Sequence, residues 1–183
     1  MQKYVALLRG INVGGNKKVP MAELKKVLEK SGLINVKTLL ASGNVVFSQR
    51  DGFPESNSNI LQLQTLIPSI IEKEFGFPVP VLLRTHKEIE KIIELNPFKE
   101  IKVTPQIRLY VTFLFENPEK KSTASYISKD ESFKIILLSD KTVFSVLDLS
   151  ISNTPEAMNM LEKIYGKNIT TRNWNTILKI ANL

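Results

Sequence analysis

The first half of the chain alternates short apolar runs with helical stripes of apolar residues. The run Tyr-Val-Ala-Leu-Leu at 4–8 is apolar on both alternating faces, which is typical of a central strand. The pattern then predicts a helix, a two-stranded hairpin, a second helix and a strand, over residues 20–31, 36–47, 63–75 and 79–83. Pro68 either kinks the second helix or marks a later start. This β-α-β-β-α-β order predicts a ferredoxin-like sandwich.

A trailing helix and a repeat of the same order follow. A capping box at 85–88 opens the helix, and prolines near both ends bound a connector over 96–106. Beyond it the pattern predicts three strands, over residues 108–115, 133–138 and 142–149. It also predicts a helix over 118–127 between the first two strands, and a helix over 154–164, with Thr154 as N-cap, after the third. A C-terminal helix is predicted over 172–181. The predicted fold class is α+β, with two tandem ferredoxin-like (βαββα) units at 1–95 and 107–183.

The two hairpins also resemble each other in residue type. Residues 37–48 and 134–145 align without gaps and match at 6 of 12 positions. Apolar strands converge easily, so an ancient duplication and convergence both explain the match. The repeated element order supports two similar units in either case.

A basic, glycine-rich turn follows the first strand and leads to the first helix. It consists of Arg9, Gly10, Ile11, Asn12, Val13, Gly14 and Gly15, and Lys17 and Lys18 come directly after it. Asn16 occupies the lysine position of a P-loop, and the spacing of glycines also fails the dinucleotide fingerprint. A flexible turn can still direct amide N–H groups at an anion beside cationic side chains. Alternatively, Gly14 and Gly15 only permit positive φ in a tight loop.

The predicted topology adds further residues to this turn. In a ferredoxin-like unit the first and third strands are antiparallel neighbours, so we expect the hairpin turn at 42–44 beside the turn at 9–15. The C-terminal helix presents Trp174 on its apolar face and Arg172 on its polar face, which could close over the glycine turn. The predicted ligand-binding set is therefore Arg9, Gly10, Asn12, Gly14, Gly15, Lys17, Lys18, Ser42, Asn44, Arg172 and Asn173.

Composition narrows the function classes. The chain has 25 Lys and Arg against 18 Asp and Glu, a formal net charge of +7, which favours an anionic partner. The absence of cysteine excludes disulfides, thiolate metal sites and a cysteine nucleophile. His86, the only histidine, is expected to be solvated, and no cluster has metal-ligand spacing. No signal peptide or membrane span is recognisable, so a cytoplasmic protein without membrane contact is expected.

Three stretches resemble one bacterial family. They are Leu-Leu-Arg-Gly-Ile-Asn-Val-Gly-Gly at 7–15, Ser-Gly-Asn-Val-Val-Phe at 42–47 and Arg-Asn-Trp-Asn-Thr at 172–176. Together they are similar to the signature stretches of the uncharacterised family known as domain of unknown function 1697. The resemblance supports the choice of site residues and implies no activity, cofactor or substrate.

Three functions remain open on the sequence. The first is binding of a small anionic or nucleotide-like ligand at the turn over 9–15. The second is binding of RNA or single-stranded DNA, although the strand at 45–47 lacks the aromatic pattern of an RNA-recognition sheet. The third is an interaction protein in which the glycine turn is structural. The sequence assigns no catalytic residue, cofactor or oligomeric state.

Overall fold

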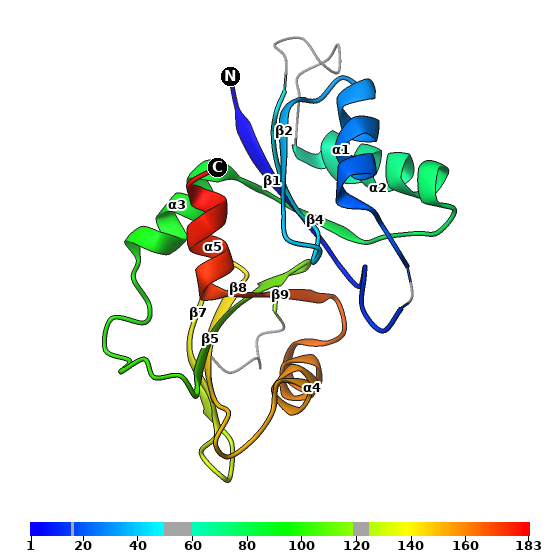
Figure 1. Ribbon diagram of the computed structural model, residues 1–183. Coiled ribbons are helices and arrows are strands. Elements are labelled where there is room, and N and C mark those ends of the chain that lie inside the picture. Colours follow the sequence, from blue (N-terminus) through cyan, green and yellow to red (C-terminus); the bar gives the residue numbers. More distant parts are fainter. Residues whose placement is uncertain (16, 50–59, 119–124) are drawn as a thin grey trace. The chain divides into compact units, whose positions relative to one another are not determined.

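The chain forms two compact units, each built on an antiparallel sheet (Figure 1). The computed structural model describes residues 1–15, 17–49, 60–118 and 125–183. Unit 1 comprises Met1–Lys91 with Ile180–Leu183, and unit 2 comprises Ile92–Lys179. Among the described residues, no helix is long and apolar enough to cross a lipid bilayer.

Unit 1 contains a four-stranded sheet in the order β2-β3-β1-β4. Its elements are β1 (Lys3–Leu8), α1 (Met21–Lys30), β2 (Ile34–Leu39), β3 (Asn44–Ser48), α2 (Ile60–Phe75), β4 (Val81–Thr85) and the start of α3 (His86–Glu94). β1 lies between β3 and β4 and is antiparallel to both. The predicted pairing of the first and third strands is therefore confirmed.

The core of unit 1 lies between one face of this sheet and the helices α1 and α2. Leu8 and Phe47 from the sheet pack in one buried cluster with Leu24 of α1 and Ile67 of α2. The core residues alternate along the strands and recur every three or four residues along the helices, which is the spacing that predicts these elements. Pro68 lies inside α2, so the alternative of a later helix start is wrong.

Unit 2 contains a five-stranded sheet in the order β6-β7-β8-β5-β9. Its elements are β5 (Ile107–Leu114), β6 (Tyr126–Ile127), β7 (Phe133–Ser139), β8 (Thr142–Asp148), α4 (Thr154–Tyr165), β9 (Ile169–Asn173) and most of α5 (Trp174–Ala181). α4 covers one face of the sheet with Ala157 and Leu161, which pack with Phe133 and Val143.

Three predictions about unit 2 need correction. Most of the predicted helix at 118–127 lies outside the described residues, and its last two residues form the strand β6. Asn153, whose side chain accepts a hydrogen bond from the Glu156 amide, is the N-cap of α4 in place of Thr154. Residues 172 and 173 belong to the strand β9, not to the C-terminal helix. The β-branched residues Ile169, Thr170 and Thr171 carried a signal for this strand.

Candidate functional site

The turn at 9–15 and the hairpin turn after β2 lie side by side in unit 1. The Leu8 amide donates to the Gly43 carbonyl at 2.8 Å, and the Arg9 amide donates to the Pro80 carbonyl at 2.9 Å. A Cβ added to Gly43 would lie 2.7 Å from Leu8 Cβ and 2.8 Å from Ile11 Cδ1. The predicted proximity of these two loops is therefore confirmed, and the absence of a side chain at Gly43 permits it.

Gly14 and Gly15 form the tip of a tight turn. Their φ angles are 60° and 79°, and the Asn12 amide donates to the Lys17 carbonyl at 3.2 Å below them. Successive positive φ angles favour glycine strongly. Apart from its chain neighbours, no described residue has an atom within 4 Å of a Cβ added to Gly14 or Gly15, so the described part of the chain leaves the space above the tip open. α1 begins only at Met21, so these glycines do not form its N-terminus.

Asn12 holds the turn in place. Its Nδ2 donates to the carbonyls of Val19 at 3.0 Å and Ala41 at 2.8 Å, and its Oδ1 accepts from the Val19 amide at 2.9 Å. Asn12 itself has a positive φ of 56°. These bonds connect the turn to the hairpin before β3, so the geometry gives Asn12 a structural role. Contact between Asn12 and a ligand stays a prediction.

Asn44 has a comparable role in the hairpin. It is fully buried, and its Nδ2 donates to the Leu39 carbonyl at 2.8 Å and to Ser42 Oγ at 3.1 Å. Ser42 is exposed. Of the two predicted site residues in this hairpin, Ser42 is thus the accessible one.

The cations of the turn differ in how they are engaged. The Arg9 side chain is half-exposed, and its guanidinium has no hydrogen bond or ion pair with the residues that the structure describes. Lys17 donates from Nζ to the Pro78 carbonyl at 2.9 Å. Lys18 is exposed. Arg9 and Lys18 therefore carry charge that the described protein groups leave uncompensated.

Arg172 and Asn173 lie in unit 2, in β9. Arg172 Nη1 donates to Thr170 Oγ1 at 2.9 Å and to the Thr171 carbonyl at 2.8 Å. The side chain is 7% exposed, and this burial lowers its pKa to about 10. Asn173 Oδ1 accepts from the Asn175 amide at 3.0 Å at the start of α5. Both residues have structural contacts within unit 2.

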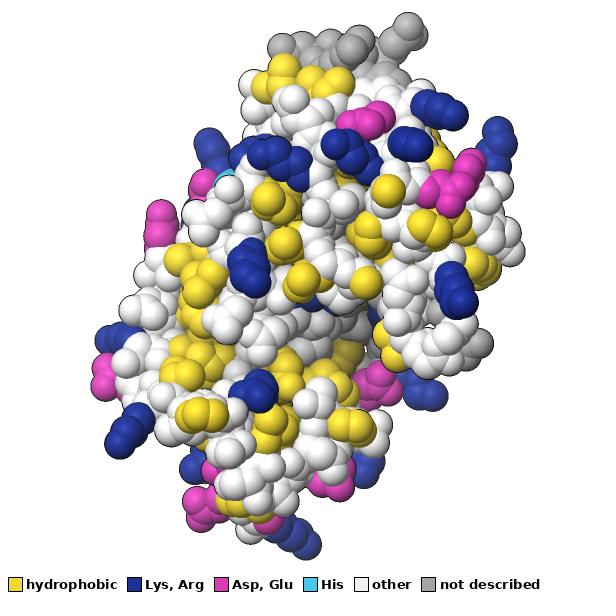
Figure 2. All heavy atoms as spheres, in the orientation of Figure 1, with side chains coloured by type: hydrophobic (Ala, Val, Ile, Leu, Met, Phe, Trp, Pro, Cys, Tyr) yellow, Lys and Arg dark blue, Asp and Glu magenta, His cyan; other side chains and the backbone are white. Residues whose placement is uncertain are grey.

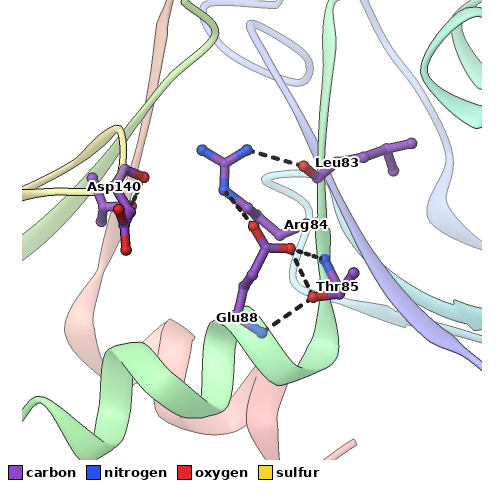
Figure 3. Close-up of polar contacts among 6 residues, drawn as sticks. Leu83, Arg84, Thr85, Glu88 and Asp140 are labelled. Atoms are coloured by element: carbon purple, nitrogen blue, oxygen red, sulfur yellow. Dashed lines mark hydrogen bonds and ion pairs between the residues drawn. The ribbon is translucent and has the colours of Figure 1, made fainter. Parts of the chain in front are cut away.

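The Glu88 carboxylate of unit 1 has structural contacts with Thr85 and Arg84 (Figure 3). Glu88 Oε2 accepts from the amide and the hydroxyl of Thr85 at 2.6 and 2.7 Å, and the Glu88 amide donates to Thr85 Oγ1 at 3.2 Å. The predicted capping box is therefore confirmed. The second carboxylate oxygen lies 3.8 Å from Arg84 Nε. Burial lowers the pKa of Arg84, and the charge of Glu88 partly offsets that shift.

His86 departs from its predicted environment. It is 8% exposed rather than solvated, and Nδ1 lies 3.0 Å from Glu90 Oε1. Nε2 is buried and has no hydrogen-bond partner in the part of the chain that the structure describes. Within the described ranges, His, Asp and Glu side chains form no group of three that could hold a metal ion.

The central strands of the two sheets offer no exposed aromatic residue for base stacking. Every residue of β3 is buried, and the aromatic residues Tyr4, Phe47, Tyr110, Phe113 and Phe144 are at most 8% exposed. RNA-recognition sheets stack bases on exposed aromatics of these strands. This burial disfavours that mode of nucleic-acid binding.

Comparisons with known proteins concern family and fold. The model of the family described as protein of unknown function (DUF1697) matches residues 1–144, which include the first two signature stretches but not the third. A search of curated proteins gives no match. Among solved structures, the conserved bacterial protein SP0830 from Streptococcus pneumoniae is similar, with a TM-score of 0.74 and 24% identity over 99% of this chain and 97% of that one. At this identity the similarity shows the fold alone.

Proposed function

We propose that this chain, which belongs to the family of proteins of unknown function DUF1697, binds a small anionic ligand at the turn over residues 9–15. One observation carries the proposal. The Arg9 guanidinium stands where the buried strand β1 ends, half-exposed and unpaired among the described residues. A guanidinium presents several N–H donors in a planar fork that matches a carboxylate or a phosphate.

The surroundings of Arg9 support the same ligand class. Lys18 adds a second cation that has no partner among the described residues, and the space that these residues leave open at Gly14 and Gly15 allows a ligand to approach the backbone closely. Ser42 adds an exposed hydroxyl from the adjacent hairpin. Asn12 and Asn44 keep the two loops in this arrangement through their hydrogen bonds. A nucleotide-like ligand fits this set through its phosphates, and no residue here assigns a reaction.

We also propose that both units are ferredoxin-like. The order β2-β3-β1-β4 in unit 1 recurs as β7-β8-β5-β9 in unit 2, with antiparallel neighbours throughout. This is the strand order expected of a β-α-β-β-α-β chain with right-handed crossovers. The division at 1–95, 96–106 and 107–183, the ligand contacts of Arg172 and Asn173, and a cytoplasmic location stay predictions.

A thermal-shift screen tests the ligand proposal. Nucleotides, sugar phosphates and small carboxylates are added to the parent protein, to Arg9→Met and to Lys26→Met, a control that removes one exposed cation on α1. A ligand present at 100 times its Kd stabilises by about 2.7 kcal/mol, which raises the Tm of a chain of this length by roughly 5–10 °C.

The two variants then separate a specific contact from general charge. We expect the shift to persist in Lys26→Met and to disappear in Arg9→Met, while the unliganded Tm of both stays within about 2 °C of the parent. A parent protein that no ligand of these classes stabilises would refute the proposal, as would an unchanged shift in Arg9→Met.

A further inference from the structure

A cavity of about 520 Å³ lies at the other end of β1, within unit 1. It is lined by Lys3 of β1, by Lys25 and Glu29 of α1, and by the β2 residues Asn35 and Lys37. Lys3 and Arg9 are separated by the length of β1, roughly 20 Å of extended strand. The cavity is thus distinct from the turn at 9–15, and its volume falls in the range of small-molecule sites.

The sheet register places two of the lysines on one face. Lys3 pairs with Ser48, and Lys37 pairs with Val46. Directly opposed residues of antiparallel strands point to the same face, and so do residues two apart on one strand. Lys3 and Lys37 therefore project from the same side of the sheet, opposite to Phe47, which belongs to the core with α1 and α2.

A β-bulge in the edge strand opens the cavity toward α1. The register of β2 shifts between Ile34 and Lys37, so Asn35 and Val36 together oppose the single residue Phe47. Asn35 is exposed and has a positive φ of 54°, so the strand bends at this point. The bulge interrupts the edge of the sheet, and Lys25 and Glu29 of α1 line the same cavity as the bulged residue Asn35.

The charges of the cavity favour an anion. Lys25 Nζ lies 3.7 Å from Glu29 Oε1 in an exposed pair, and Lys37 Nζ donates one hydrogen bond to the Leu183 carbonyl at 2.7 Å. Lys3 has no side-chain partner among the described residues. Figure 2 shows several Lys and Arg side chains, with Asp and Glu among them, over the part of the surface that carries α1 and β2. Three lysines and one glutamate thus line the cavity, together with Leu183, whose backbone oxygen accepts the hydrogen bond from Lys37.

We infer that this cavity, lined by Lys3, Lys25 and Lys37, is a binding site for a small phosphorylated molecule, separate from the turn at 9–15. Ammonium groups act as point charges with three rotatable N–H donors each, so several of them suit the dispersed charge of a polyphosphate better than a single planar carboxylate. Glu29 pairs with Lys25 at 3.7 Å within the lining of the cavity, and the exposed Asn35 side chain adds a neutral amide donor to that lining.

Titration of the full chain with inorganic pyrophosphate, followed by amide NMR, tests this inference. We expect the amide signals of residues 35–37 to shift. The double variant Lys3→Met/Lys37→Met should bind at least about tenfold more weakly, because it loses two charge-assisted hydrogen bonds. The control Lys26→Met/Lys30→Met removes the same charge from exposed positions of α1 outside the cavity and should change the affinity less than about twofold.

The readout separates this site from the turn at 9–15. Shifts confined to residues 9–18 and abolished by Arg9→Met would overturn the inference while supporting the proposed function. An equal loss of pyrophosphate affinity in both double variants would also overturn the inference, since the anion would then be attracted by the overall positive charge of the surface and not by the lysines of the cavity. Absence of pyrophosphate binding at millimolar concentration would do the same. Lys3→Gln/Lys37→Gln, checked for a folded spectrum, replaces the methionine variant if that variant unfolds.

Discussion

Gly43 is the residue at which the contact between the two loops of unit 1 can be tested most directly. In Gly43→Ala the new Cβ would lie 2.7 Å from Leu8 Cβ and 2.8 Å from Ile11 Cδ1, both in buried residues. Leu8 Cβ is fixed to the backbone of β1, so it cannot move aside as a flexible side-chain end could. The φ of Gly43 is 79°, a conformation that alanine adopts only under strain.

The two costs can be estimated separately. The left-handed conformation costs alanine about 1–2 kcal/mol. Overpacking of a filled region costs about 1–3 kcal/mol. The sum predicts that Gly43→Ala lowers the free energy of unfolding by about 2–5 kcal/mol. Gly14→Ala is the matched control, because Gly14 has a φ of 60° and no described residue beyond its chain neighbours comes within 4 Å of its Cβ position. It should lose only the conformational part, about 1–2 kcal/mol.

Urea denaturation of the parent and both alanine variants, followed by circular dichroism, measures the difference. We expect Gly43→Ala to lose about 1–3 kcal/mol more than Gly14→Ala. Equal losses in the two variants would show that the hairpin turn does not pack against the end of β1. The arrangement of the candidate site would then be wrong as well.

Three further perturbations test other parts of the structure. Asn12→Ala removes three hydrogen bonds and should destabilise by about 2–4 kcal/mol in urea denaturation with or without ligand; a loss below about 0.5 kcal/mol would contradict the structural role. Trp174 is half-buried and packs edge-to-face on Phe98 at 5.2 Å, so Trp174→Ala should cost about 2–3 kcal/mol, less than a fully buried tryptophan. Hydrogen bonds from Ser128 and Ser132 lower the pKa of Asp130 in the folded protein. The ionised Asp130 carboxylate therefore stabilises the fold above about pH 4, and this stabilisation is lost as the pH falls through the lowered pKa of Asp130. An NMR titration should show this pKa rising in Ser132→Ala, and an unchanged pKa would exclude the hydrogen bond as its cause.

Local signals in the sequence account for most of the elements. The apolar run at 4–8, the stripe with Leu24 and Leu28 and the capping box at 85–88 each depend on neighbours in the chain, and the structure has β1, α1 and α3 at these places. The strand β9 is missing from the prediction although its β-branched residues favour a strand, because it is short and ends in the polar residues Arg172 and Asn173, directly before the helical stripe of α5. β9 pairs with β5 alone, at the edge of the sheet. The motif that contains Arg172 therefore indicates a helix when only its neighbours in the chain are considered.

The candidate site shows where local reasoning ends. The sequence identified Arg9, Gly14 and Gly15 as an unusual turn, and strand topology placed the hairpin beside it. It could not show whether a polar side chain faces a ligand or the backbone. Asn12 and Arg9 are both polar residues after β1. The Asn12 side chain donates hydrogen bonds to the carbonyls of residues 19 and 41, whereas the Arg9 side chain pairs with no described group.

The sequence by itself determined the order of the elements in unit 1, the periodic residues of the cores and the positive charge, because these follow from side-chain chemistry and spacing along the chain. Only the tertiary structure decided which polar groups are already satisfied. A hydrogen bond between residues 12 and 41 depends on where two loops meet in space. The cavity at the bulge of β2 likewise exists only because the register of three strands and one helix brings Lys3, Lys25 and Lys37 to one place.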